Sequence, residues 1–195
     1  MKQRPTLQTE RLWLRPFVLA DAKEVQRLAG NKAIADTTAN IPHPYLDGLA
    51  EQWISSHQEG FEAGELINFA IVLKDSGGLI GAISLMNISA QHERAELGYW
   101  IGKPYWNQGY GTEAARAVLE YGFSVLSLNR IHGCFLKRNP ASGRVMEKIG
   151  MSYEGCLRQH DKKWEQFEDI VIYGILRSEW RNKAKQTEAS ISPNF

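Results

Sequence analysis

Two neighbouring stretches decide the fold: AELGYWI at residues 95–101 and YWNQGYGTEA at residues 105–114. The first has the apolar and aromatic residues of a strand, and beyond the second, apolar residues recur at helical spacing. Between strand and helix lies a loop with two glycines, Gly109 and Gly111. Such a loop gathers unbonded backbone N–H groups and the positive end of a helix dipole at one point. The sequence therefore predicts an anion-binding site at residues 108–112.

Outward from this loop, apolar periodicity divides the chain into strands and helices. Before the loop, three β-rich runs predict an antiparallel meander. After it, a helix, a strand and a helix bracketed by Asn139 and Gly150 predict one parallel crossover. The expected strands are 11–17, 67–74, 79–87, 95–101, 130–137, 151–157 and 167–176, and the expected helices are 21–29, 49–57, 112–126 and 140–149.

These elements predict an α+β fold with a mixed, mainly antiparallel sheet, flanking helices and one parallel crossover. We expect one domain over residues 1–182 and a polar, flexible tail over residues 183–195. The segment around residues 40–46 contains two prolines and is expected to be a loop that faces the substrate. The charged run 158–165 is expected to separate the last two strands.

Three phosphate-containing ligands compete for the glycine loop. A P-loop needs GxxxxGK followed by Ser or Thr, and the absence of lysine from the loop argues against it. Residues 109–114 satisfy the dinucleotide pattern GxGxxG/A, but the loop follows an antiparallel meander and only one crossover follows. Because Lys137 and Arg138 could meet a 2′-phosphate, a nicotinamide dinucleotide remains the second choice. The third ligand is the pyrophosphate of coenzyme A.

The quoted stretches resemble the acetyl-CoA-binding core of the GNAT N-acetyltransferases, most closely their RimJ/RimL branch. Trp106 stands where the family's loop signature usually has Gln or Arg, and an aromatic residue there is usual in that branch. The resemblance covers residues 7–180. Its further landmarks follow in the same order: TERLWLRP at 9–16, NPAS at 139–142, KIGM at 148–151, EG at 154–155 and DIVIY at 169–173.

The resemblance implies a GNAT-like fold and an enzyme, an acetyl-CoA-dependent N-acetyltransferase without a metal. Backbone amides from Gln108 to Thr112 would hold the pyrophosphate, pantetheine would run along the strand, and a backbone N–H near Ile101 would polarise the carbonyl. Asn139 has two alternative roles, as the N-cap of its helix or as a ligand of the cofactor. The implied cofactor-binding residues are Tyr99, Trp100, Ile101, Gln108, Gly109, Tyr110, Gly111, Thr112 and Asn139.

The acceptor implied by the resemblance is a primary amine, with a protein N-terminus of the ribosomal-protein type as the leading hypothesis. A free α-amine titrates near 8 and a lysine near 10.4, so neutralising them at pH 7 costs about 1.4 and roughly 4.6 kcal/mol. Two alternatives remain: a small amine such as a polyamine or aminoglycoside, which acidic residues in the cleft would favour, and a non-catalytic acetyl-CoA-binding module. Homodimers are common in such enzymes.

Two catalytic residues are predicted. Glu96, between the apolar residues Ala95 and Leu97, would be the general base, because partial burial would raise its pKa. An exposed position on an alternating strand is the structural alternative. Ser142 matches the Asn-x-x-Ser landmark and would protonate the departing sulfur, although hydrogen bonding at the helix start also explains it. The reserve acids are Tyr99, Tyr105 and Tyr153.

Composition and motif searches narrow the other functions. Lys plus Arg total 23 against 22 Asp plus Glu, a formal charge of +1 that argues against a nucleic-acid partner. The five histidines lack HExxH spacing and no GxSxG elbow occurs. Cys134 and Cys156 fit neither a disulfide framework nor a zinc site and are expected to be buried. Without an apolar leader or long apolar stretch, we expect a cytoplasmic protein with no membrane partner.

Overall fold

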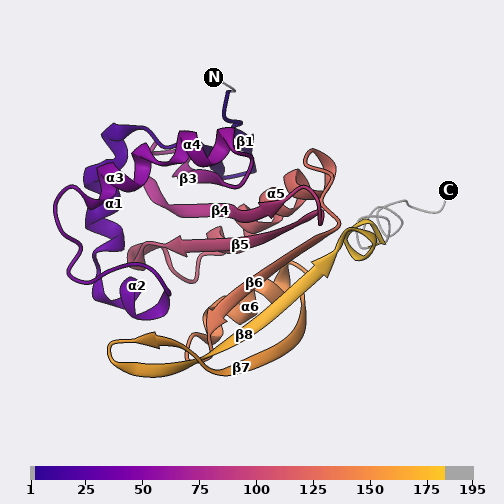
Figure 1. Ribbon diagram of the computed structural model, residues 1–195. Coiled ribbons are helices and arrows are strands. Elements are labelled where there is room, and N and C mark those ends of the chain that lie inside the picture. Colours follow the sequence, from indigo (N-terminus) through magenta and orange to yellow (C-terminus); the bar gives the residue numbers. More distant parts are fainter. Residues whose placement is uncertain (1–2, 183–195) are drawn as a thin grey trace.

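Eight strands form one sheet in the computed structural model, which describes residues 3–182, and their order is β1-β2-β3-β4-β5-β6-β8-β7 (Figure 1). The strands are β1 (Leu7–Gln8), β2 (Leu12–Arg15), β3 (Ile67–Leu73), β4 (Leu79–Ser89), β5 (Arg94–Ile101), β6 (Arg130–Leu136), β7 (Ser152–Lys163) and β8 (Gln166–Leu176). The α-helices are α1 (Ala22–Ala29), α2 (Lys32–Thr37), α3 (Leu49–Ser55), α4 (His57–Glu62), α5 (Tyr110–Ser124) and α6 (Pro140–Lys148). Short 3₁₀ turns lie at Leu19–Asp21 and Lys103–Tyr105.

The two faces of the central strands pack against different helices, because side chains alternate along a strand. Phe69 and Ile83 are fully buried in the cluster that includes the inner face of α5. Ala70 and Ala82 belong to the second cluster, which includes residues of α1 and α3. The sheet is thus covered on both faces, and the predicted α+β arrangement is confirmed.

The sheet opens between β5 and β6. These strands pair in parallel over three residues only, Arg94–Glu96 opposite Arg130–His132. Beyond that point β5 continues alongside β4 and β6 continues alongside β8. Helix α5 makes the crossover between them, as the sequence predicts. The facing edges therefore leave backbone groups free for another partner where the strands separate.

The last hairpin corrects one prediction. The charged run 158–165 was expected to be a connection, but β7 continues through it to Lys163, and only Trp164 and Glu165 form the turn. Both turn residues have positive φ, 50° and 63°, as a two-residue hairpin loop with the strands' twist requires. Strand β7 lies at the edge of the sheet, and most of its residues are exposed on both faces. Such a strand can be polar throughout, so it lacks the alternation of apolar and polar residues by which a strand is predicted.

Other differences involve short elements and boundaries. The predicted helix 49–57 is two helices, α3 and α4, joined at Ser56, and α2 and β1 were not predicted because each is short. Cys134 and Cys156 are half-buried rather than buried. No helix within residues 3–182 is long and apolar enough to cross a membrane. The predicted tail at residues 183–195 lies outside the described residues.

His57 is buried in an aromatic cage on α4. Its ring lies edge-on to Trp53 and Phe17, with centroid distances of 4.4 and 5.5 Å, and only 1% of the residue is exposed. Neither ring nitrogen has a hydrogen-bonding partner among residues 3–182. Burial, reinforced by the positive charge of Arg4, lowers the pKa of His57 to about 4. The folded protein therefore holds the His57 side chain as a neutral imidazole.

This histidine should make the protein acid-sensitive. Between pH 6.5 and pH 4 the unfolded chain binds a proton that folded His57 does not, so stability falls as pH falls, by about 2 kcal/mol at pH 5. We expect His57→Leu to lose this part of the pH dependence in thermal unfolding at pH 5 and pH 8. His92→Leu, at an exposed position, is the matched control. Equal pH dependence in both variants would contradict the assignment.

Candidate active site

A cleft of about 1040 Å³ opens where β5 and β6 separate. One wall comes from β5 and the glycine loop, another from β6 and α6, and a third from the segment 37–42, which begins at the last residue of α2. This size is at the upper end for small-molecule sites. Of the residues predicted to bind the cofactor or to act as the catalytic pair, Gln108 alone is missing from the cleft lining, and the reserve acid Tyr153 is missing too. Those that line it are Glu96, Tyr99, Trp100, Ile101, Gly109, Tyr110, Gly111, Thr112, Asn139 and Ser142.

The start of α5, where the sequence predicts an anion site, lines the cleft. Gly109 is the N-cap and has a φ of +82°, a conformation that favours glycine. The helix runs for 15 residues from Tyr110, so the N–H groups of Tyr110, Gly111 and Thr112 have no partner within its first turn. Together with the helix dipole, these donors favour a negatively charged group. The stretch predicted to bind an anion therefore forms a helix start with free N–H groups that lines the cleft.

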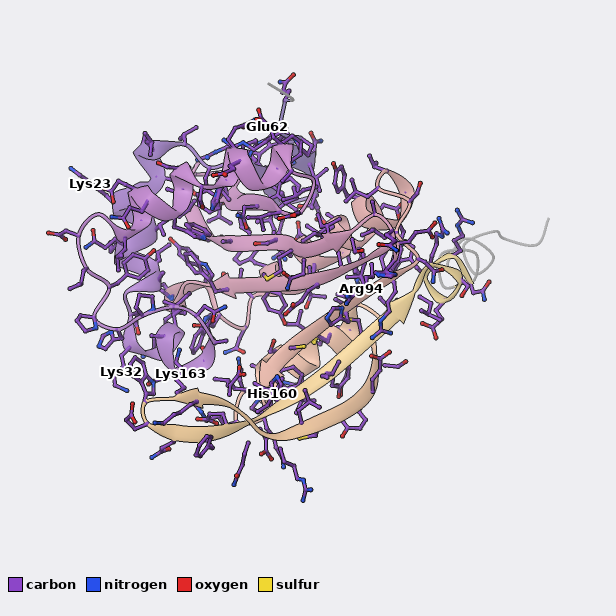
Figure 2. The ribbon with its side chains drawn as sticks, viewed as in Figure 1. Lys23, Lys32, Glu62, Arg94, His160 and Lys163 are labelled. Carbon is purple, nitrogen blue, oxygen red and sulfur yellow. The ribbon has the colours of Figure 1, made fainter. Side chains whose placement is uncertain are left out.

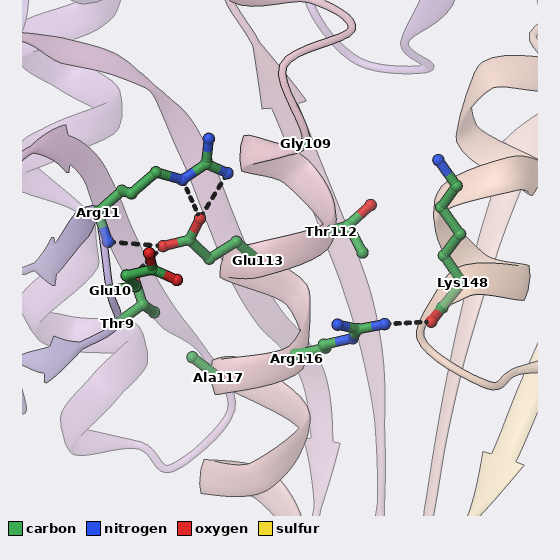
Figure 3. Close-up of a pocket in the computed structure, with 9 residues that line it drawn as sticks. All are labelled: Thr9, Glu10, Arg11, Gly109, Thr112, Glu113, Arg116, Ala117 and Lys148. Atoms are coloured by element: carbon green, nitrogen blue, oxygen red, sulfur yellow. Dashed lines mark hydrogen bonds and ion pairs between the residues drawn. The ribbon is translucent and has the colours of Figure 1, made fainter.

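Hydrogen bonds between Glu113 and Arg11 stabilise this loop (Figure 3). The Glu113 carboxylate accepts hydrogen bonds from the Thr9 hydroxyl at 2.6 Å, from the Arg11 N–H at 2.8 Å and from Arg11 Nε at 2.7 Å. Burial opposes ionisation, but these donors lower the pKa of Glu113. Arg11 Nη1 also donates to the Gln108 carbonyl at 3.1 Å, and its guanidinium stacks 4.5 Å from the Tyr110 ring centroid. The landmark near the chain start thus positions the glycine loop.

Trp106 holds the other side of the same loop. Its indole Nε1 donates to the Ile101 carbonyl at 2.5 Å, so it ties the loop to the end of β5. Gln108 turns away from the cleft, because its side-chain Nε2 donates to the Pro104 carbonyl at 3.1 Å. The aromatic residue at this position therefore has a structural role in the loop.

Two basic residues of α6 that line the cleft were not predicted. Arg144 and Lys148 lie one helical turn apart on α6, both are exposed, and both line the cleft. Neither side chain makes an ion pair or hydrogen bond in the part of the chain that the structure describes. Arg116 of α5 donates to the Lys148 carbonyl at 3.0 Å, which links the two helices (Figure 3). The sequence contained one signal for this pair: Arg144 and Lys148 are four residues apart, which places both on the same face of the predicted helix.

Glu96 lies at the point where the sheet opens. It forms the last pair of β5 with β6, opposite His132, and its Oε2 accepts a hydrogen bond from Asn87 Nδ2 at 2.9 Å. Cys134, two residues further along β6, also lines the cleft. Burial raises the pKa of the Cys134 thiol to about 11, and the Glu96 carboxylate contributes to the shift. The Cys134 thiol therefore stays protonated near neutral pH.

Ser142 and Tyr99 meet across the cleft. The Tyr99 hydroxyl lies 2.8 Å from Ser142 Oγ and donates to the Ser142 carbonyl oxygen at 3.1 Å. Burial raises the pKa of Tyr99 to about 12, although the hydrogen bond with Ser142 lowers it in part. The phenol is thus neutral, and the pair joins β5 to the first turn of α6 as two linked O–H groups.

Asn139 occupies the N-cap position of α6 without acting as a side-chain cap, so the predicted capping bond is absent. Its Nδ2 donates instead to the Thr37 carbonyl oxygen at 3.1 Å, across the cleft. The segment 37–42 is therefore tied to α6. The loop at residues 40–46, which was predicted to face the substrate, lines the cleft with Asn40, Ile41, Pro42 and Tyr45.

The charge of the cleft is low. Glu96 and Asp161 are the acidic residues that line it within residues 3–182, and the segment 40–46 contains none. No group of three or more potential metal ligands occurs in the described part of the chain.

Comparisons with known proteins agree with this geometry. The family model described as the acetyltransferase (GNAT) domain matches residues 11–152, so the chain belongs to the GNAT acetyltransferase family. Its members use acetyl-CoA, and this chain is an acetyl-CoA-dependent N-acetyltransferase.

Three similar proteins illustrate the range of the family. The chain is 33% identical over 157 residues to the Bacillus subtilis protein named "Putative ribosomal N-acetyltransferase YdaF", covering 80% of this chain and 78% of that protein. It is 27% identical over 144 residues to the spermidine N(1)-acetyltransferase of Escherichia coli, covering 74% of each. A GNAT-family acetyltransferase structure from Bacillus anthracis superposes with a TM-score of 0.79 at 27% identity, covering 90% of this chain and all of that one. The ribosomal type of YdaF is consistent with the RimJ/RimL branch.

Proposed function

We propose that this N-acetyltransferase modifies the α-amine of a protein N-terminus, of the ribosomal-protein type. The observation that carries the proposal is the low charge of the cleft, in which Glu96 and Asp161 are the acidic lining residues. A polyamine carries several positive charges and calls for more carboxylates than these, whereas a peptide end brings one amine. An α-amine is also deprotonated at a cost about 3 kcal/mol lower than that of a lysine.

Acetyl-CoA would lie along the cleft from α5 to Glu96. The pyrophosphate would accept hydrogen bonds from the free N–H groups that open α5, with the Gly109 region allowing close approach. Arg144 and Lys148 would add positive charge beside these phosphates. Pantetheine would extend the sheet by pairing with the free edge of Tyr99 and Trp100, with Ile101 at the end of the strand. Among residues 3–182 the Asn139 side chain bonds only through Nδ2, to Thr37, so its Oδ1 atom would be available as an acceptor for the cofactor.

Glu96 would act as the general base, directly or through water. As the amine nitrogen attacks the thioester carbonyl carbon, its proton passes to the Glu96 carboxylate. The carbon–sulfur bond then breaks, and the departing thiolate takes a proton from Ser142 Oγ, which lies 2.8 Å from the Tyr99 hydroxyl. The Tyr99 hydroxyl lies within reach of both Ser142 oxygens, so it would return a proton to Ser142 Oγ by turning its O–H from the carbonyl, and solvent would then reprotonate Tyr99 and take the proton from Glu96. Tyr153 is less suited because it does not line the cleft, whereas Tyr105 lines it and stays a reserve acid.

Two other functions are less well supported. Acetylation of a small amine is favoured by the similarity to a spermidine acetyltransferase, but the cleft has few carboxylates. A non-catalytic acetyl-CoA-binding module would have no need of a carboxylate at the sheet opening or of linked hydroxyls on the opposite wall.

A thiol-release assay with acetyl-CoA tests the acceptor class. Peptides that begin with Ala, Ser or Met should release coenzyme A well above the rate without acceptor, and should exceed spermidine and free amino acids. The matched control is each peptide with its N-terminus already acetylated, which leaves any lysine free. Release that persists with the blocked peptide would point to a side-chain amine, and release with spermidine alone would replace the proposal by the polyamine alternative.

A further inference from the structure

The wall formed by the segment 37–42 is held by side chains that lie far away in the sequence. The segment leaves α2 without joining another helix or strand, and it lines the cleft. Four of its carbonyl oxygens accept hydrogen bonds from two residues. Asn139 donates to Thr37, and Lys163 donates to Thr38, Ala39 and Ile41.

Lys163 is well matched to this role. It ends β7 with only 8% of its surface exposed. Its Nζ lies 3.1 Å from the Ala39 oxygen and 3.3 Å from the Ile41 oxygen, with the Thr38 oxygen closer still. A lysine ammonium has three N–H donors and no acceptor, so three carbonyls use all of them.

Burying an ammonium is costly unless its donors are satisfied. Burial and the charge of Arg138 lower the pKa of Lys163, whereas Asp36 and Glu168 oppose that effect. A simple helix cap would need only the last carbonyls of α2, but this contact extends four residues beyond the helix end, to Ile41. The bonding therefore shapes the segment itself and does more than complete the helix.

The hairpin tip around Lys163 is docked on α2. Trp164 Nε1 donates to Asp36 Oδ1 at 2.8 Å, and the amines of Lys163 and Lys32 lie 5.1 and 6.0 Å from the Trp164 ring centroid. Figure 2 places Lys32 and Lys163 beside one another, where α2 meets the end of the β7–β8 hairpin. The chain thus closes around the cleft through contacts between the C-terminal hairpin and the N-terminal helices.

We propose that Lys163 is a positioning residue for the acceptor, because its ammonium fixes the segment 38–41 as the wall of the acceptor end of the cleft. This inference rests on the proposed function for the location of the acceptor. Because the glycine loop and the proposed pyrophosphate donors lie on other elements, we expect acetyl-CoA affinity to change little when Lys163 is replaced.

Lys163→Met tests the proposal in the full chain, with the best N-terminal peptide of the thiol-release assay as acceptor. We expect the KM for the peptide to rise about 10-fold or more, since small displacements of a positioning wall are costly, while acetyl-CoA affinity by calorimetry stays within twofold. Lys162→Met is the matched control, because Lys162 is the exposed neighbour that pairs with Glu165. It should keep wild-type kinetics.

Hydrogen exchange provides a measurement that needs no acceptor. Peptides spanning residues 36–44 should exchange faster in Lys163→Met than in the wild type or in Lys162→Met, with the glycine loop unchanged. An unchanged peptide KM with unchanged exchange would overturn the inference and leave the proposed function intact. An equal loss of acetyl-CoA affinity would also overturn it. If the wild type acetylates no peptide, the proposed function fails, and unchanged exchange would then show that Lys163 does not hold the segment either.

Discussion

Glu96→Gln should lower kcat for acetyl transfer by about 10²-fold or more, while acetyl-CoA affinity stays at the wild-type value. Glu96 lies at the last pair of β5 and β6, lines the cleft and is held through Oε2 by the Asn87 amide. Glutamine has nearly the same size but cannot take the proton of the attacking amine. Thiol-release rates at saturating substrate, measured from about pH 6 to pH 9, should lose the limb that belongs to this base.

Two variants control for effects other than the loss of a base. Glu62→Gln removes an exposed carboxylate on α4, outside the cleft, and should leave kcat unchanged. Ser142→Ala should lower kcat but keep the wild-type dependence on the base, because it removes only the proton donor for the thiolate. If Glu96→Gln kept the wild-type pH–rate profile, Glu96 would not be the base and another cleft residue would have to be found.

The sequence alone was sufficient for those parts of the site that come from neighbouring residues. The strand 95–101, the glycine loop and the helix start lie within about 20 residues, and their geometry follows from local rules for strands, glycines and helix ends. Glu96 could be placed in the cleft because it lies on the strand that leads into the glycine loop. The crossover then brought Ser142 onto the opposite wall, where it meets Tyr99.

The rest of the cleft depends on contacts that no local pattern contains. Lys163 bonds Thr38 across 125 residues of chain, and Asn139 bonds Thr37 across 102. The charged run 158–165 resembles a loop, because an edge strand exposed on both faces has no alternation to detect. The sequence pattern around Asn139 is typical of an N-cap, but such a local pattern contains no information about a distant carbonyl that competes for the side chain.

Gly109→Val should weaken acetyl-CoA binding by about 100-fold or more, because two or more charge-assisted hydrogen bonds would be lost. A Cβ at Gly109 would meet only Arg11 Nη2 at 3.5 Å, an ordinary contact, so the effect does not come from a collision. It comes from the φ of +82°, which a β-branched residue avoids. Valine would turn the peptide that presents the first free N–H of α5 away from the phosphates. Calorimetry with acetyl-CoA measures the loss.

Gly48→Val separates the phosphate site from backbone strain in general. Gly48 is also a helix N-cap, of α3, with a φ of +85° and nothing within 4 Å of an added Cβ. Both variants should lose comparable thermal stability, because the same residue is forced into the same conformation. Only Gly109→Val should lose acetyl-CoA affinity. If Gly109→Val kept wild-type affinity, the phosphates would not bind at the start of α5. If both variants bound acetyl-CoA equally weakly, the loss would come from a destabilised fold. The comparison thus distinguishes a helix start that binds the cosubstrate from one that is only part of the scaffold.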